Sequence, residues 1–219
     1  METKSFIEEE LVKLRASILD MASRVESDIG KALAAFINGD KELAKEVIAN
    51  DKIINDLQLK IEDETATAIA TQAPVAGDMR ELITIFKIAG NLERIGDYAV
   101  HLAKAAIKLS NEPPFRSLEH IEKMAETGQT MLRSAVTAFL ERDADAARET
   151  AKKDFIIDSE HKLLTEEILD FIKLKKGGVK KAVRMLKISG NLERLGDHIT
   201  TICESVVYMV IAKREELND

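Results

Sequence analysis

The chain has 219 residues, of which 45% are hydrophobic and 32% charged, and its formal net charge is −7. This balance is typical of a folded protein of one or two domains and excludes a disordered chain. Net negative charge argues against nucleic acid as the main partner, because neutralising phosphates requires a basic surface. No apolar run approaches the roughly 20 residues that span a bilayer, so we expect contact with a membrane only through partners.

The residue types favour helices and a reducing compartment. Trp is absent and aromatic residues make up only 4%, whereas strands favour aromatic and β-branched residues. The single cysteine, Cys203, lies among apolar residues and is expected in the core rather than in a disulfide. The opening METKSFIEEE lacks the basic-then-apolar pattern of a signal peptide. These features predict a cytoplasmic protein.

Three long helices are expected in the first half, over residues 5–37, 41–71 and 78–109. The first two are separated by Asn-Gly-Asp at 38–40, a strong turn signal. The second and third are separated by QAPVAGD, whose proline cannot continue a helix.

The segment SNEPPFRS, at residues 110–117, follows with two consecutive prolines. A proline also disfavours the helical conformation in the residue before it, so the chain should leave the helix here. We therefore place a domain boundary in this segment, with one unit over residues 1–112 and another over 113–219.

The second half repeats the plan of the first, with helices expected over residues 118–141, 144–174 and 179–214. AFINGDKELAKEVIANDKIIN and AFLERDADAARETAKKDFIID align with an offset of 103 residues, and the motifs that follow align with an offset of 100. The three lost residues fall in the turn, where QAPVAGD is shortened to LKKGGVK.

Apolar residues follow the third helix of each half in steps of three and four, the pattern of a helix packed against neighbours. In the two helices these are Ile85, Ile88, Leu92, Ile95, Ala99, Leu102 and Ala106, and Met185, Ile188, Leu192, Leu195, Ile199, Ile202, Val206 and Met209. The sequence predicts an all-α fold of two tandem three-helix bundles, produced by internal duplication and related by pseudo-two-fold symmetry.

One motif is repeated almost unchanged: KIAGNLERIGD at 87–97 returns as KISGNLERLGD at 187–197. Each copy holds a Glu and an Asp one helical turn apart, on the flank beside the apolar stripe. Like charges at this spacing repel by a few tenths of a kcal/mol, and neither copy has removed the repulsion. The repeat therefore indicates a function for the acidic pair.

The preceding helix of each half carries a matching polar stripe, which an antiparallel packing would bring to the acidic pair. Clustered oxygen ligands suit Mg, Mn or Ca, and suit iron or zinc when an imidazole joins them. The candidate metal ligands are Asp51, Asn55, Glu93, Asp97 and His101 in the first half and Asp154, Asp158, Glu193 and Asp197 in the second.

Other interpretations stay open at this level. A Glu and an Asp on a helix flank are ordinarily solvated surface residues. If they bind no metal here, the chain would be a metal-free helical adaptor. The same carboxylates could serve a metal-dependent enzyme, although no phosphate loop or other catalytic motif occurs. The motif glycines are expected to permit close helix approach. His120 has no identifiable partner and is expected at the surface.

The chain resembles the PhoU family over essentially its whole length. The resemblance rests on the order of four sequence segments: FINGDKELAKEVIANDKIINDLQLKIED, PVAGDMR, NLERIGD and NLERLGDHITTICESVVY. The resemblance implies two three-helix bundles and a Glu/Asp-x-x-x-Asp signature in each half. In that family the signature can bind multinuclear iron or zinc clusters on the bundle surface. Here it corresponds to Glu93–Asp97 and Glu193–Asp197, with His101 where the family commonly has Asn.

The resemblance also implies a role without catalysis. PhoU proteins are negative regulators of phosphate uptake and of the phosphate-starvation response. They are thought to link the ATPase subunit of the phosphate ABC transporter to a membrane sensor histidine kinase. We accordingly expect a cytoplasmic, homodimeric regulator that is not an enzyme and has no catalytic residues.

Overall fold

The computed structural model describes residues 2–110, 118–174 and 178–218, and these ranges contain helices and no strand. The helices are α1 (Glu2–Asn38), α2 (Lys41–Gln72), α3 (Ala76–Leu109), α4 (Leu118–Glu141), α5 (Ala144–Ala151), α6 (Asp154–Lys173) and α7 (Val179–Ile211). The all-α prediction is therefore confirmed. The expected linker and the shortened second turn fall largely on residues 111–117 and 175–177, which lie outside the described ranges.

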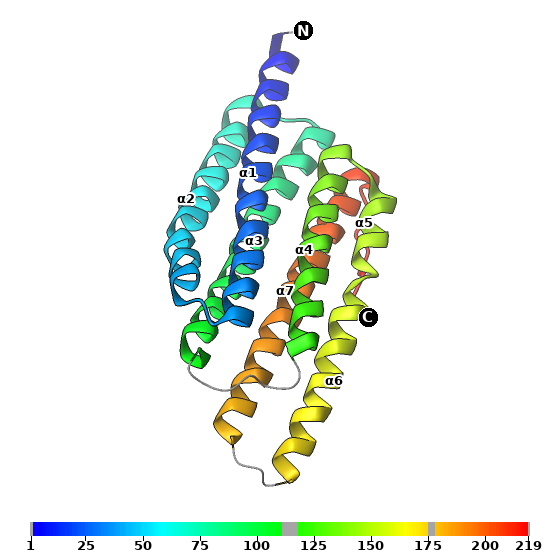
Figure 1. Cartoon of the computed structure of the whole chain (residues 1–219). Coiled ribbons are helices and arrows are strands. Elements are labelled where there is room, and N and C mark those ends of the chain that lie inside the picture. The colour runs from blue at the N-terminus through cyan, green and yellow to red at the C-terminus, as the bar shows by residue number, and fades with distance from the viewer. Residues whose placement is uncertain (1, 111–117, 175–177, 219) are drawn as a thin grey trace.

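The helices form two bundles side by side, α1–α3 and α4–α7 (Figure 1). Each helix of the second bundle runs opposite to its counterpart in the first, as an approximate two-fold relation requires. The counterparts α3 and α7 pack against each other at the centre of the molecule. Thr84 of α3 donates a hydrogen bond to the carbonyl of Ser205 in α7 at 3.2 Å.

Equivalent aspartates begin the second helix of each bundle. The Asp40 carboxylate accepts from the backbone N–H groups of Glu42 and Leu43 at 3.0 Å, and so supplies partners that the helix itself leaves unsatisfied. Asp143 caps α5 in the same way. The residue before each cap is left-handed, Gly39 with φ 66° and Arg142 with φ 56°. The turn geometry of the first half is thus repeated without its glycine.

Two expected helices differ from the structure. The helix predicted over 144–174 is divided, because Lys153 and Ile156 donate to carbonyls only three residues back and tighten the turn between α5 and α6. The helix predicted over 179–214 ends at Ile211 instead. Ala212 adopts φ 59°, a left-handed conformation that terminates the helix and turns the chain back.

The apolar stripes face the core, as predicted, and every residue of both stripes is buried. Cys203 is also fully buried, and this burial raises the pKa of its thiol to about 12. None of the described helices combines the length and apolar character needed to cross a membrane.

An ion-pair cluster that the sequence did not predict ties the bundles together. Glu81 of α3 is 1% exposed and accepts from Arg15 of α1 at 2.6 Å and from Arg142 at 2.8 Å. Because Arg142 follows the last residue of α4, this buried carboxylate connects both halves of the molecule. A buried carboxylate requires such partners, since its charge would otherwise be uncompensated.

Candidate metal sites

The first acidic patch comprises Asp51 and Asn55 on α2 and Glu93, Asp97 and His101 on α3. Because the two helices are antiparallel neighbours, their polar stripes meet along one flank of the bundle (Figure 1). Burial and the charge of Asp97 raise the pKa of Asp51, and the same two causes raise that of Glu93. The carboxylates of the two helices are therefore close enough for their charges to repel.

Two further features of the first patch bear on metal binding. The Oδ1 atom of Asn55 is buried and has no hydrogen-bond partner. Burial lowers the pKa of His101, against the opposing effect of Asp97, which favours the neutral imidazole that binds metals. Arg94 lies 3.7 Å from Asp97 and compensates part of the negative charge.

The second acidic patch comprises Asp154, Asp158 and His161 on α6 and Glu193 and Asp197 on α7. Burial raises the pKa of Asp158, and the charge of Asp197 raises it further. Burial and Asp197 likewise raise the pKa of Glu193, while His161 lowers it. The two acidic stripes of this half are brought together as well, and a histidine from the α6 stripe joins them.

Asp154 is the most constrained of these carboxylates, because it is only 3% exposed. Its Oδ2 atom accepts from the Thr200 hydroxyl at 3.1 Å, and its Oδ1 atom is buried without a hydrogen-bond partner. Burial, followed by the charge of Asp158, raises its pKa from 3.8 to about 6. An unpaired carboxylate oxygen in such a place is suited to a proton or a cation.

A motif glycine makes room for this carboxylate. A Cβ atom added to Gly196 would lie 2.1 Å from Oδ1 of Asp154, far inside van der Waals contact. A Cβ added to its counterpart Gly96 would meet methyl groups of Ile54, at 3.4 Å, and Val25, at 3.8 Å. The expectation that the motif glycines permit close approach is borne out at Gly196, where a carboxylate approaches. A Cβ on Gly90 or Gly190 would have no neighbour closer than 3.9 Å.

One of the two differences between the motif copies positions His161. Ser189 replaces Ala89, and its hydroxyl lies 2.9 Å from Nδ1 of His161. Because this hydroxyl already donates to the carbonyl of Leu186, it accepts the proton on Nδ1. The Nε2 atom of His161 then carries the lone pair, as a metal ligand requires.

The donor chemistry of both patches fits a metal ion, and each contains a buried oxygen without a partner. As the side chains are placed, however, no three His, Cys, Asp or Glu residues of the described part of the chain form a group that could hold an ion. The helices thus supply the ligands on shared flanks, and the side chains would have to reorient to surround a cation.

The two patches are connected through the centre of the molecule. Asn91 and His198, one residue from each signature region, lie 2.8 Å apart from Oδ1 to Nδ1. The rings of Tyr98 and His198, which occupy equivalent positions, have centroids 5.8 Å apart. Each acidic pair is therefore mounted on one of two directly contacting helices.

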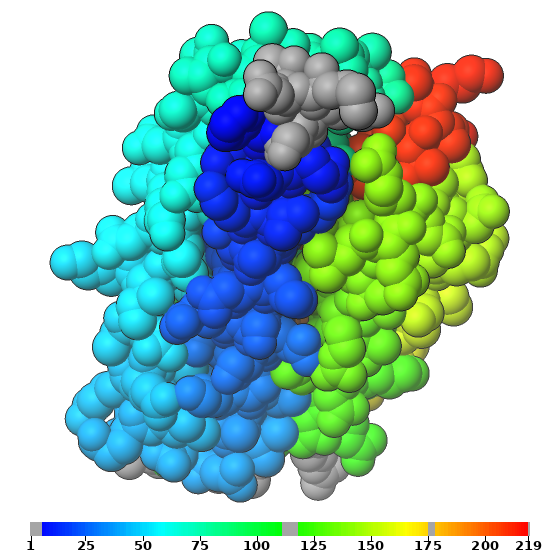
Figure 2. Space-filling model, turned by 90° about the horizontal axis from the view of Figure 1, so that it is seen from above, coloured from blue at the N-terminus to red at the C-terminus, as the bar shows by residue number. Residues whose placement is uncertain are grey.

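The segment 212–218 covers only the second patch. It lies beside α5, as the red surface in Figure 2 shows, and Glu215 accepts from Arg148 through both carboxylate oxygens at 2.8 and 2.9 Å. Leu217 donates its backbone N–H to Glu204 at 3.0 Å. Asn218 then donates to Oδ1 of Asp197 at 2.9 Å.

The prediction that His120 lies at the surface without a partner was wrong. Its ring contacts Glu160, which is only 7% exposed, and Glu167 at 3.4 Å. Burial opposes protonation, but these hydrogen bonds raise the pKa of His120 overall. Lys123 also pairs with Glu160. The partners lie about 40 residues away, so no local pattern could have revealed them.

Sequence reasoning also missed Glu62 in the first patch. Its charge contributes to raising the pKa of Glu93, and Oε1 lies 3.9 Å from the position of a Cβ on Gly90. A signal was present, because Glu62 is seven residues after Asn55 and so continues the α2 stripe by two turns.

Comparison with known proteins gives consistent results over the whole chain. A family model described as PhoU domain matches residues 18–106 and 121–206. The phosphate-specific transport system accessory protein PhoU homolog of Clostridium acetobutylicum is 35% identical over 218 residues, covering 99% of this chain and 100% of that protein. The protein of the same name from Streptococcus pneumoniae is 34% identical, covering 95% and 97%.

Two solved structures share the fold. The crystal structure of PhoU from Pseudomonas aeruginosa superposes with a TM-score of 0.90 at 32% identity, covering 94% of this chain and 99% of that one. The crystal structure of the phosphate transport system regulatory protein PhoU from Streptococcus pneumoniae gives a TM-score of 0.89 at 32% identity, covering 95% and 99%.

Proposed function

This chain belongs to the PhoU family, and from that membership we propose that it restrains phosphate uptake and the phosphate-starvation response. It is a regulatory or accessory protein of phosphate transport, as the names of its relatives state for them, and it is not an enzyme. The hypothesis of a metal-dependent enzyme is therefore dropped. We place its action in the cytoplasm, where it would meet the transporter ATPase subunit and a sensor histidine kinase.

The observation that carries this proposal is the pairing of two signature motifs on the contacting helices α3 and α7. Each motif presents its acidic patch on a long helical flank, and extended rigid faces suit reversible contact with other proteins. The two helices run in opposite directions side by side, and each bundle carries one copy of the motif (Figure 1). One protein could thereby engage two partners, or two copies of itself in a homodimer.

We further propose that the acidic patches bind metal ions. The ligands would be Asp51, Asn55, Glu93, Asp97 and His101 in the first patch and Asp154, Asp158, His161, Glu193 and Asp197 in the second. A bound cation would neutralise the mutual repulsion that raises the carboxylate pKa values. The buried oxygens of Asn55 and Asp154 that lack partners support this assignment.

The adaptor role is tested by affinity purification of the tagged chain from cells grown at high and at low phosphate. We expect the transporter ATPase subunit and the sensor kinase to co-purify, more strongly at high phosphate. Lack of both associations under both conditions would contradict the role as an adaptor, while leaving membership of the family intact.

The metal assignment is tested by elemental analysis of the purified chain, of Glu93→Ala, and of Glu193→Ala. Each variant should lose metal from its own half, because each removes one carboxylate of one patch. Glu126→Ala, which removes an exposed carboxylate of α4 outside both patches, is the control and should retain the metal of the wild type. Equal trace metal in all four proteins would exclude the proposed ligands.

A metal-free adaptor is the second candidate. It is favoured by the absence of a ready-made three-ligand group among the described His, Cys, Asp and Glu residues. In that case the wild type and both patch variants would contain no stoichiometric metal and would associate equally with the two partners.

A further inference from the structure

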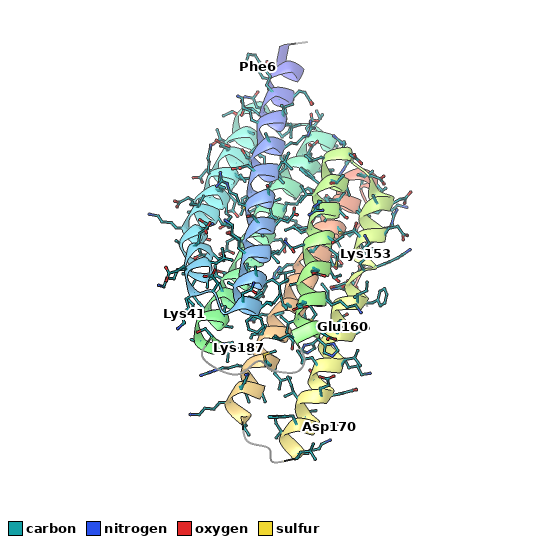
Figure 3. All side chains as sticks on the ribbon, viewed as in Figure 1. Phe6, Lys41, Lys153, Glu160, Asp170 and Lys187 are labelled. Atoms are coloured by element: carbon teal, nitrogen blue, oxygen red, sulfur yellow. The ribbon has the colours of Figure 1, made fainter. Side chains whose placement is uncertain are left out.

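The end of the α6–α7 hairpin differs from the rest of the molecule in its charge and in its exposed apolar residues. We call the described residues 173–174 and 178–184 the α6–α7 tip. The hairpin extends past the beginning of α4, at one end of the long axis of the molecule (Figure 1). Asp170 lies just before this end, while Lys187 lies well away from it along α7 (Figure 3). The tip is therefore an isolated projection with its own surface chemistry.

The charge of the tip is opposite to that of the whole chain. Its nine residues include Lys173, Lys180, Lys181 and Arg184 and no acidic residue, whereas the chain carries a net charge of −7. The Lys173 ammonium pairs with Asp170 at 3.0 Å, but both side chains are more than 70% exposed, so this pair is weak. A concentrated positive charge thus stands at the end of an acidic body.

Apolar side chains are exposed among these charges. Leu174 is 63% exposed, Val179 is 53% exposed and Val183 is 55% exposed. At the corresponding end of the first bundle, Met79 and Ile83 occupy the positions equivalent to the two valines and are half-buried. Exposed aliphatic residues that gather at one place commonly mark an interaction site.

The first bundle covers its equivalent end with α1. Ile7 and Leu11 of α1 are buried, and Glu10 shares a surface groove with Thr71 and Gln72 at the end of α2. In the second bundle, α4 begins at Leu118, whose counterpart is Arg15 of α1. The residues equivalent to the turns of α1 before Arg15 lie outside the described ranges, and the described helices leave the valines and the leucine of the tip exposed.

We propose that the α6–α7 tip binds the surface of an anionic lipid membrane. Lysines around exposed aliphatic residues are the combination that such a surface attracts, through lipid charge and through shallow burial of the side chains. Protein interfaces are instead enriched in Tyr, Trp and Arg and depleted in Lys. The described tip contains three lysines, one arginine and no aromatic residue.

This contact would be direct, whereas the sequence predicted membrane contact only through partners. It would also be end-on, because an anionic surface repels the acidic flanks. Glu193 is 14 residues along α7 from Val179, or roughly 20 Å at the rise of an α-helix. That separation exceeds the screening length at physiological salt, so the second acidic patch stays free for other contacts while the tip is bound.

The test is co-sedimentation of the purified full chain with vesicles of phosphatidylcholine alone, or with about one third phosphatidylglycerol. EDTA is present throughout, so that no metal bridges the acidic patches to lipid phosphate. We expect binding only to the anionic vesicles, and weaker binding as salt is raised. The assay contains neither transporter nor kinase, so its outcome is independent of the proposed regulatory role.

Two double variants test the positive charges and the apolar side chains of the tip separately. Both alter exposed side chains. Lys173→Gln with Lys180→Gln should weaken the partition coefficient about 30-fold, because two charges near the surface are removed. Val179→Ser with Val183→Ser should weaken it about tenfold. Val75→Ser is the matched control, because Val75 is 71% exposed and precedes α3 in the α2–α3 turn. That turn and the tip lie at opposite ends of the molecule (Figure 1).

Circular dichroism of each variant confirms that the helices are retained. The proposal is overturned if the wild type does not bind anionic vesicles, or if the charge variant binds as strongly as the wild type. Capture of the wild type by immobilised polyglutamate without any vesicle binding would also overturn it, and would assign the tip to an acidic protein.

Discussion

The two acidic patches carry the same motif but hold their carboxylates differently. In the first patch Asp51 is half-buried on a continuous helix, and its charge meets that of Asp97 across the flank. In the second patch the equivalent Asp154 is 3% exposed and begins a new helix directly after the break in the chain. The same residue at the same place in the repeat is thus a flank carboxylate in one half and a core carboxylate in the other.

The residues around the motif account for this difference. Thr200 offers Asp154 a hydroxyl, whereas the equivalent position in the first half is Val100, whose side chain has no hydrogen-bonding group. Segment 212–218 closes over the second patch through Asn218, which donates to Asp197. A repeated signature therefore does not imply two equal sites. The pKa of each carboxylate and the access to it depend on neighbours that the duplication did not preserve.

The largest expected effect comes from Asp154→Asn, measured as the free energy of unfolding against pH in the presence of EDTA. The folded pKa of Asp154, about 6, lies above the ordinary value of 3.8. Its contribution to stability is therefore complete below about pH 4 and is lost as the pH rises through about 6. Relative to the wild type, the variant should gain about 2–3 kcal/mol between about pH 4 and about pH 8.

Asp51→Asn is the matched control in the first patch. It should show a change in the same direction but smaller, since Asp51 is much more exposed than Asp154. Equal pH profiles for the two variants would mean that both aspartates have the same surroundings, and the contrast between the patches would fail.

The second largest expected effect is on the free energy of unfolding when a motif glycine is replaced by alanine. The substitution should affect the two halves differently. Gly196→Ala places its Cβ against Asp154 and should destabilise the protein by about 2 kcal/mol in chemical denaturation. Gly96→Ala makes ordinary contacts with Ile54 and Val25 and should be neutral, or stabilising by up to about 1 kcal/mol through helix propensity.

Combining Gly196→Ala with Asp154→Ala should recover much of the lost stability, because the carboxylate that clashes is gone. If the double variant is as unstable as the sum of the single variants, the crowding has another source.

The smallest expected effect concerns segment 212–218. Arg148→Ala removes both hydrogen bonds to Glu215 and should speed hydrogen exchange of the Leu217 amide several-fold, with little change in global unfolding. Lys152→Ala, which removes an exposed pair on the same stretch, should leave that amide protected. Unchanged exchange in Arg148→Ala would show that the segment is held by its other contacts.

Much of the fold followed from local patterns. The turns around Gly39 and the apolar stripe through Ile85, Ile88 and Leu92 lead to the correct helices, because periodicity and turn chemistry act over a few residues. The division between α5 and α6 could not be predicted in this way. Residues 152 and 153 are two lysines within a helical pattern, and the break coincides with the buried position of Asp154.

The site was predicted unevenly for the same reason. The stripes through Asp51 and Glu93 are local features of single helices, and their antiparallel packing places them on one flank. The contacts of His120 with Glu160 and of Asn218 with Asp197 join distant segments, and no spacing in the sequence encodes them. His161 was visible on its stripe, but its orientation depends on Ser189 of another helix.

The sequence by itself determined that this protein is a duplicated helical bundle with an acidic signature in each half. Helix periodicity and the repeated motif are local patterns, which depend only on residues close together in the chain. Only the tertiary structure decided which carboxylate is buried, which end of a hairpin is exposed, and which patch a terminal segment covers. These properties depend on what packs against each side chain, and burial sets the pKa and accessibility of a group more strongly than its own residue type does.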